Sequence, residues 1–214
     1  MTFNLGYATS SLLFIVFFVV MLSFQLGSVK YIPKIYWLVI LATSTLGTTL
    51  SDYMDRTLNL GYAAGSTILV SLLCLMLLVW KLSQKSLSVT QITNRKSEAF
   101  YWGTILISNT LGTALGDFLA DDSGLGFAGG ALLIGSLLLV IVLLHYYSKV
   151  SAVMLFWIAF VLTRPFGATF GDLLTKASNK GGIDFGTKGA SLILFALFLI
   201  LLYIETKKVK SQAN

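Results

Sequence analysis

The chain has 214 residues, of which 56% are hydrophobic and 11% charged, and its mean hydropathy is +0.84. This composition is far too apolar for a soluble globular domain, so it predicts an integral membrane protein whose main partner is the lipid bilayer. The formal net charge of +6 would suit nucleic acid, but the distribution of the charges argues against that partner.

Seven apolar stretches follow one another along the chain, each about the twenty residues that a helix needs to cross a hydrocarbon core of ~30 Å. They cover approximately residues 8–27, 35–54, 62–81, 99–119, 126–147, 151–174 and 187–204. We therefore expect an all-α, polytopic transmembrane helix bundle of about seven spans, forming one domain over residues 1–214. The first stretch has no basic region before it, so no cleavable signal peptide is expected.

Basic residues lie mainly on one side of the expected membrane. If successive spans alternate in direction, one side carries Lys30, Lys34, Lys81, Lys85, Arg95, Lys96, Lys149, Lys207, Lys208 and Lys210. The other side carries Arg56, Lys176, Lys180 and Lys188, together with the aspartates. By the positive-inside rule the first side is cytoplasmic, which puts the C-terminus inside and the N-terminus of this chain outside. The negative outer face would concentrate cations, although lysine depletion explains its charge equally well.

One pattern occurs three times: a tryptophan, a glycine ten positions later and an aspartate fifteen positions later. The copies are Trp37, Gly47 and Asp52; Trp102, Gly112 and Asp117; and Trp157, Gly167 and Asp172. A second motif opens the following apolar stretch: Asn59-Leu60-Gly61-Tyr62, Gly124-Leu125-Gly126-Phe127, Asp184-Phe185-Gly186-Thr187 and, near the start, Asn4-Leu5-Gly6-Tyr7. These patterns predict parallel two-helix repeats over approximately residues 31–95, 96–149 and 150–208, preceded by a half-repeat in 1–30.

The repeated segments resemble a bacterial inner-membrane family. The resemblance rests on Tyr36-Trp37, Tyr101-Trp102, Phe156-Trp157, Leu46-Gly47-Thr48, Leu111-Gly112-Thr113, Gly116-Asp117-Phe118-Leu119, Gly171-Asp172-Leu173-Leu174 and Leu162-Thr163-Arg164-Pro165-Phe166-Gly167-Ala168. That family consists of uncharacterised proteins with four tandem two-span repeats, each with a characteristic tryptophan. The resemblance implies eight spans and a bacterial cytoplasmic membrane, but no substrate. Because the first motif-bearing helix is lacking, we expect either a naturally shortened member or a start codon assigned too far downstream.

Polar residues recur seven, eleven and fifteen positions after the repeated tryptophans, which places them on one helix face. They are Ser44, Thr48 and Asp52 in the first copy, Asn109, Thr113 and Asp117 in the second, and Arg164, Ala168 and Asp172 in the third, where alanine interrupts the stripe. A polar stripe that faced lipid would be costly, so we expect it to face the inside of the bundle.

Charges at these positions need partners. Three carboxylates around one axis repel one another unless a cation, protons or a basic residue intervenes. We expect Arg164 to pair with Asp52 or Asp117 across the bundle, either for transport or as a structural salt bridge that locks the helices. Pro165 is expected to kink the helix beside it.

The other repeated residues have structural interpretations. Gly112 with Gly116, Gly167 with Gly171 and, more weakly, Gly47 with Ser51 form small-xxx-small pairs that favour close helix packing. Trp37, Trp102 and Trp157 are expected to act as interfacial anchors. No function is expected of the single cysteine, Cys74, or the single histidine, His145, and no cofactor is predicted.

The stripe favours a small transporter or channel for a cation or a proton-coupled solute, with aspartate, threonine and asparagine oxygens as ligands. Arg164 disfavours a simple cation pore and fits charge-balanced gating or an anionic group on the substrate. The alternative is a non-transporting accessory or structural protein whose stripe only holds helices together. An enzyme is not expected, because the Gly-x-Gly-Asp signature of intramembrane aspartyl proteases is absent. The substrate, any metal and the oligomeric state stay open.

Overall fold

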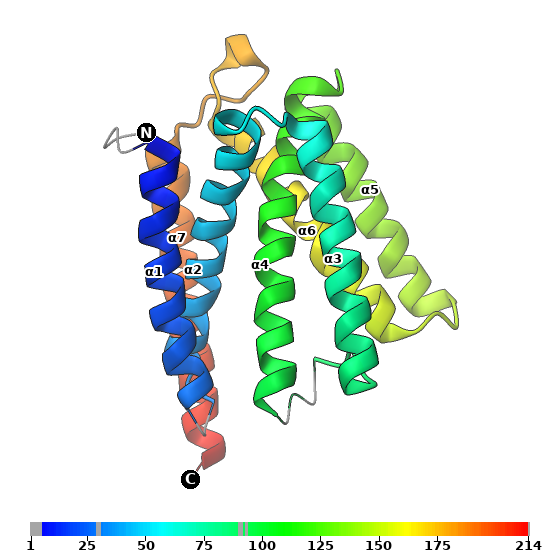
Figure 1. Cartoon of the computed structure of the whole chain (residues 1–214). Helices are drawn as coiled ribbons and strands as arrows, with labels where there is room; N and C mark the ends of the chain where they lie inside the picture. Colours follow the sequence, from blue (N-terminus) through cyan, green and yellow to red (C-terminus); the bar gives the residue numbers. More distant parts are fainter. Residues whose placement is uncertain (1–5, 29–30, 90–91, 93, 214) are drawn as a thin grey trace.

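The computed structural model describes residues 6–28, 31–89, 92 and 94–213, with side chains up to residue 207 (Figure 1). The described chain is all-α, as predicted. Its α-helices are α1 (Gly6–Gly27), α2 (Pro33–Asp52), α3 (Tyr62–Gln84), α4 (Arg95–Asp117), α5 (Gly126–Tyr147), α6 (Ala152–Thr175) and α7 (Thr187–Ala213). Of the residues used above, Asn4, Leu5 and Lys30 lie outside the described residues, as do the side chains of Lys208 and Lys210.

The motif before each return helix is a turn with two residues in the left-handed region. The glycine that precedes or opens the helix has φ of 74° at Gly61, 65° at Gly126 and 82° at Gly186. Two positions earlier, φ is 56° at Asn59, 76° at Gly124 and 62° at Asp184. Glycine, asparagine and aspartate are the residues that adopt this conformation at least cost, which explains why these residue types recur there.

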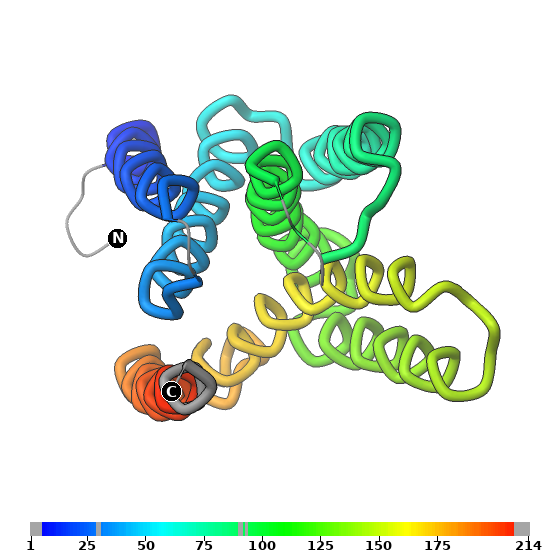
Figure 2. Tube along the Cα trace, turned by 90° about the horizontal axis from the view of Figure 1, so that it is seen from below, coloured from blue at the N-terminus to red at the C-terminus, as the bar shows by residue number. Residues whose placement is uncertain are grey.

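The motif helices α2, α4 and α6 pack side by side in chain order, and α4 lies between the other two (Figure 2). Each of α1, α3 and α5 packs against the motif helix that follows it in the chain. The last return helix, α7, makes only limited contacts with α2 and α6. The three repeats therefore use the same packing, and α4 is the most enclosed helix.

Five helices of the described chain are long and apolar enough to cross a membrane: α1, α3, α5, α6 and α7 up to Lys207. The protein is therefore an integral membrane protein. The two helices that do not reach this hydropathy, α2 and α4, carry polar residues that neighbouring helices cover. Thr43 in α2, and Thr104 and Ser108 in α4, are 0% exposed, so these polar groups are shielded from lipid.

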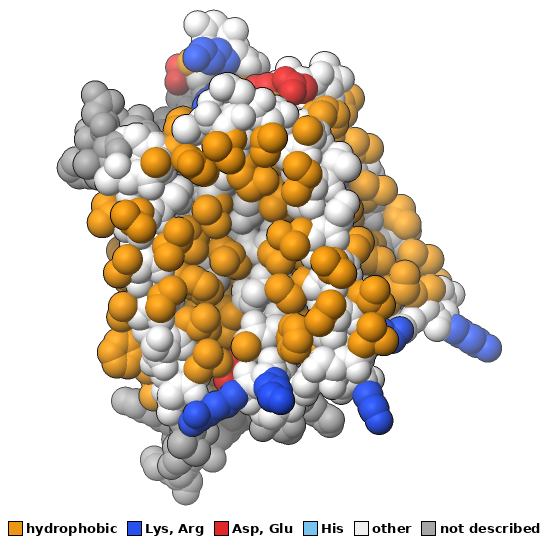
Figure 3. Space-filling view, in the orientation of Figure 1, with side chains coloured by type: hydrophobic (Ala, Val, Ile, Leu, Met, Phe, Trp, Pro, Cys, Tyr) orange, Lys and Arg blue, Asp and Glu red, His pale blue; other side chains and the backbone are white. Residues whose placement is uncertain are grey.

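The two ends of the bundle differ in charge (Figure 3). We call the end where α2 and α4 begin the basic end, because it carries Lys34, Lys81, Lys85, Arg95, Lys96 and Lys149. We call the opposite end the acidic end, because it carries Asp52, Asp55, Asp117, Asp121, Asp122 and Asp172. On the face that Figure 3 shows, hydrophobic side chains lie over much of the surface between the two ends.

Close contacts between motif helices depend on glycine. A Cβ added at Gly47 would clash with Asn109 of α4, one at Gly112 with Arg164 of α6, and one at Gly116 with Ala168. The packing role expected of Gly167 and Gly171 is not found, because nothing lies within 4 Å of a Cβ at either position. The physical reason is that Gly47, Gly112 and Gly116 each contact the next motif helix along the chain, and no further motif helix follows α6 in the described chain.

This difference predicts opposite outcomes for two equivalent substitutions. Gly112→Ala should lower the free energy of unfolding by roughly 1–3 kcal/mol, because the added methyl group forces α4 and α6 apart. Gly167→Ala should leave stability nearly unchanged. Thermal unfolding of both purified variants in the same detergent measures the effect, and equal melting temperatures would contradict this packing.

Candidate functional site

A polar cavity of about 240 Å³ lies between α2, α4 and α6. It is lined by Ser44, Thr48, Asn109, Gly112, Thr113, Thr163, Arg164, Gly167 and Ala168. The structure thus brings together the two residues nearest the tryptophan in each copy of the predicted stripe. Because α2 and α6 hardly touch and Thr48, Thr163 and Gly167 are exposed, the cavity is open on the side between those helices.

Helix packing positions the polar side chains of this cavity. Contact at Gly47 brings the Cβ of Asn109 against α2, and contact at Gly112 brings the Cβ of Arg164 against α4. The hydroxyl oxygens of Thr48 and Thr113 lie 3.3 Å apart, and this hydrogen bond joins equivalent positions of two repeats. Part of the stripe therefore connects helices directly.

Two side chains of the cavity have polar atoms without partners in the described chain. Asn109 is 5% exposed, and neither its amide oxygen nor its amide nitrogen has a hydrogen-bond partner. The Nε of Arg164 is also buried without a partner. The guanidinium carbon of Arg164 lies 4.8 Å from the centre of the Phe160 ring. This cation–π contact does not satisfy the hydrogen-bond donors of the guanidinium.

The expected pairing of Arg164 with Asp52 or Asp117 is wrong. Arg56 takes that role: its Nε lies 3.1 Å from the Oδ1 of Asp52, and its Nη2 lies 3.3 Å from the Oδ2 of Asp117. Asp172 pairs instead with Lys176, at 3.8 Å. Arg164 precedes Asp172 by eight residues, about 12 Å along a helix, so it lies too deep to reach the aspartates.

Sequence reasoning missed Arg56, although a signal was present. Arg56 and Lys176 each stand four positions after the aspartate of their repeat, which is helical ion-pair spacing. The second copy has Asp121 at the equivalent position. The copy without its own basic residue is the one whose aspartate shares Arg56.

The three motif aspartates lie beyond the cavity, toward the acidic end, and none of them lines it. Among the described residues, no group of three or more histidine, cysteine, aspartate or glutamate side chains could hold a metal ion. The stripe therefore divides into two parts. One part is the cavity, which is lined by neutral residues and Arg164, and the other is the acidic end, where the motif aspartates form ion pairs.

Asp55 is a second residue that the sequence did not single out. It lies in a π-helical turn, η1 (Tyr53–Thr57), directly after α2, and η2 (Phe118–Asp122) follows α4 in the same way. Asp55 is 7% exposed; its Oδ2 accepts a hydrogen bond from Ser51 at 3.2 Å, and its Oδ1 has no partner in the described chain. Burial raises the pKa of Asp55, with a further contribution from Asp52.

The anchoring role expected of the tryptophans is wrong for two of them. Trp102 is 0% exposed and Trp157 is 4% exposed, so both face protein rather than lipid headgroups. The Nε1 of Trp157 donates a hydrogen bond to the carbonyl of Leu87, at 3.0 Å. Because α4 and α6 each pack against more than one other helix, these neighbouring helices cover the two indole rings.

Comparison with known proteins gives a family and no function. A family model described as Repeat of Unknown Function (DUF347) matches residues 35–86, 100–151 and 155–210. Each match covers a motif helix and the return helix after it. No curated protein and no solved structure matches the chain.

The buried Asp55 carboxyl predicts a pH dependence of stability. Its pKa is raised in the folded protein, so its contribution is most favourable below the ordinary aspartate pKa and is lost as the pH rises through the raised value. Asp55→Asn should therefore increase the melting temperature at pH 7 and reduce the decline between mildly acidic and neutral pH. Thermal unfolding across that range, with exposed Asp122→Asn as control, tests this; a lower melting temperature of Asp55→Asn at pH 7 would contradict it.

Arg56 and Lys176 should differ in their importance for stability. Arg56→Gln leaves two carboxylates, each 18% exposed, without a shared cation, and should cost on the order of 2 kcal/mol. Lys176→Gln removes one exposed local ion pair and should cost less than about 1 kcal/mol. Chemical denaturation measures both, and adding Asp117→Asn to Arg56→Gln should restore part of the loss. Equal effects of the two single substitutions would contradict the bridging role.

Proposed function

Because the chain belongs to the family defined by the Repeat of Unknown Function (DUF347), we propose a function from what its three repeats build: transport of a small polar solute that carries an anionic group. The observation that carries this proposal is the cavity on which equivalent positions of all three repeats converge. Among the described residues that line it, Arg164 alone is charged.

The unpartnered polar atoms support a binding role. Polar groups buried within membrane-spanning helices are costly unless they find partners. A solute with an acid group would accept hydrogen bonds from the Arg164 guanidinium and the Asn109 amide. The hydroxyls of Ser44 and Thr113 would complete its coordination, and the volume of about 240 Å³ suits a solute of a few non-hydrogen atoms.

An anionic group fits this cavity better than a bare cation. A cation would meet the positive charge of Arg164 without a lining carboxylate to offset it. The aspartates on which a cation site would depend are already paired with Arg56 and Lys176. The cation half of the sequence hypothesis therefore has less support than the proton-coupled solute.

Proton coupling would involve the acidic end. Asp55 is adjacent to Arg56 in sequence and has a pKa raised above that of an ordinary aspartate, so it is a candidate to take up the coupled proton. Neutralising this carboxyl would lower the repulsion that an anionic solute meets at the acidic end. No covalent step is part of the proposed function.

We also propose an orientation and a location. The excess of lysine and arginine at the basic end favours a cytoplasmic position for that end in a bacterial inner membrane. The C-terminus would then be cytoplasmic, and an anionic solute would enter from outside past Arg56.

Uptake by proteoliposomes tests the proposal. Vesicles containing the full chain should accumulate one or more members of a panel of small carboxylates, inorganic anions and, for comparison, monovalent and divalent cations. Arg164→Gln should reduce that uptake at least about tenfold, the loss expected for one charge-assisted contact of ~1.4 kcal/mol or more. Arg95→Gln, which removes an exposed positive charge at the basic end, should leave it unchanged.

No uptake of any member, or full uptake by Arg164→Gln, would overturn the proposal. The Thr48 to Thr113 hydrogen bond favours a second candidate, an accessory protein whose stripe only joins helices. A cysteine at position 44, introduced as Ser44→Cys in a Cys74→Ser background, distinguishes the two. A charged, water-soluble thiol reagent should label it in a transporter and should not label it in a scaffold with a dry stripe.

A further inference from the structure

A second cavity, of about 480 Å³, lies at the basic end, and its lining includes the aromatic pairs of the first two repeats. These pairs are Tyr36 with Trp37 and Tyr101 with Trp102, from α2 and α4. The equivalent Trp157 packs against Trp80 and does not line this cavity. The repeated aromatic residues therefore build a cavity that the proposed transport site does not use.

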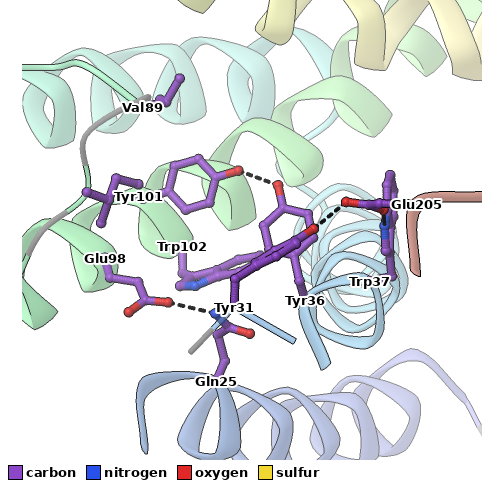
Figure 4. A pocket seen from close by; sticks show the side chains of 10 residues that line it. Gln25, Tyr31, Tyr36, Trp37, Val89, Glu98, Tyr101, Trp102 and Glu205 are labelled. Carbon is purple, nitrogen blue, oxygen red and sulfur yellow. Dashed lines mark hydrogen bonds between the residues drawn. The ribbon is translucent and has the colours of Figure 1, made fainter. Parts of the chain in front are cut away.

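Two carboxylates face each other across the aromatic rings (Figure 4). Glu98 comes from the first turn of α4 and Glu205 from α7, and both line the cavity. Glu98 accepts a hydrogen bond from Gln25 at 2.9 Å, and Glu205 accepts bonds from the Tyr31 hydroxyl and the Trp37 ring nitrogen. All three donors are neutral. Among the side chains that the structure describes, no lysine or arginine forms an ion pair with either carboxylate.

The aromatic rings form a continuous wall between these carboxylates. Ring centres lie 5.6 Å apart for Tyr31 and Tyr36, 5.4 Å for Tyr36 and Trp102, and 5.1 Å for Tyr101 and Trp102. The hydroxyls of Tyr36 and Tyr101 are 2.7 Å apart and hydrogen-bonded, which fixes the two rings relative to each other. Aromatic faces carry negative electrostatic potential and attract organic cations.

Two buried polar atoms of the cavity lack partners in the described chain. Gln25 is 8% exposed, and its Oε1 accepts no hydrogen bond, although its Nε2 donates to Glu98. Trp102 is 0% exposed and its Nε1 donates to nothing. A buried carbonyl oxygen without a donor is what an ammonium N–H would satisfy.

We propose that this cavity binds a small organic cation, an ammonium group attached to an apolar body. The charged group binds at the Glu205 carboxylate, the opposite Glu98 carboxylate with its partner Gln25 adds to the negative potential of the cavity, and the rings of Tyr31 and Tyr36 contact the rest. An inorganic ion fits poorly, because the volume is within the range of small-molecule sites and the described residues offer no three-ligand metal group. The site is distinct from the Arg164 cavity in position and in the charge that it selects.

Partial burial and the neighbouring Glu205 carboxylate raise the pKa of the Tyr31 phenol. The phenol therefore remains protonated at neutral pH and continues to donate to Glu205. This hydrogen bond thereby keeps the Glu205 carboxylate oriented.

Binding of 2-phenylethylammonium to the full chain in lipid nanodiscs tests this site, with neutral 2-phenylethanol as the matched probe. Titration calorimetry should give an affinity for the ammonium at least about tenfold higher than for the alcohol, since only the ammonium gains cation–π contacts and attraction to the carboxylate. This comparison needs no variant. Equal affinities, or no binding of the ammonium, would overturn the proposal.

Matched variants locate the binding. Glu205→Gln should weaken ammonium binding about tenfold and leave alcohol binding unchanged, whereas Tyr31→Phe, which keeps the ring, should have a smaller effect. Asp122→Asn, which removes an exposed carboxylate at the acidic end, should leave both affinities unchanged. If Glu205→Gln does not fold, Glu98→Gln gives the same test from the other side. Unchanged affinity in the folded carboxylate variants would overturn the site, whatever the outcome of the uptake experiment.

Discussion

The polar cavity depends on the close approach of α4 to its two neighbouring motif helices. Gly47 and Gly112 remove the side chains that would hold these helices apart, and the Cβ atoms of Asn109 and Arg164 occupy the space. Both residues have buried polar atoms without a partner in the described chain. In the first two repeats, the glycine ten positions after the tryptophan thus brings the residue seven positions after the next tryptophan into the bundle interior. The same glycine contact therefore sets both the spacing of the helices and the position of the polar side chain in the cavity.

Arg164 and Arg56 show how depth decides the role of a charge. Arg56 lies in the π-helical turn after α2, where it is partly exposed and reaches two aspartates. Arg164 lies in the middle of α6, where burial makes an unpaired guanidinium costly, and no carboxylate of the described residues forms an ion pair with it. The first arginine relieves repulsion between repeats, whereas the second remains available to an anion. The acidic end and the cavity therefore differ in whether their arginine is already paired with carboxylates.

Much of the architecture could be predicted from the sequence, because helix length, hydropathy and the spacing of Trp, Gly and Asp that occurs three times can be read directly from the chain. The inward face of the stripe followed from the same reasoning, since Ser44, Asn109 and Arg164 share a helical position and do converge. Ion-pair partners could not be predicted as well, because the choice between Arg164 and Arg56 depends on how far each helix is displaced along the bundle axis. The burial of Trp102 and Trp157 was missed because their depth was inferred without knowing which neighbours cover them. Gly167 was misjudged for the converse reason: its repeat position predicts a contact that needs a following motif helix.

The repeats also explain why two cavities of opposite preference lie along the same helices. Seven residues separate Trp37 from Ser44, and Trp102 from Asn109, a rise of about 10 Å. At the levels between, Val39, Ala42 and Ile105 are 0% exposed and pack in one apolar cluster with Trp102. This packed layer lies between the levels of the two cavities, while the Arg164 guanidinium still interacts electrostatically with Tyr36 and Tyr101, which line the aromatic cavity. A repeat that supplies an aromatic pair at one level and a hydrogen-bonding residue two turns farther on can therefore support two different sites from a single pattern.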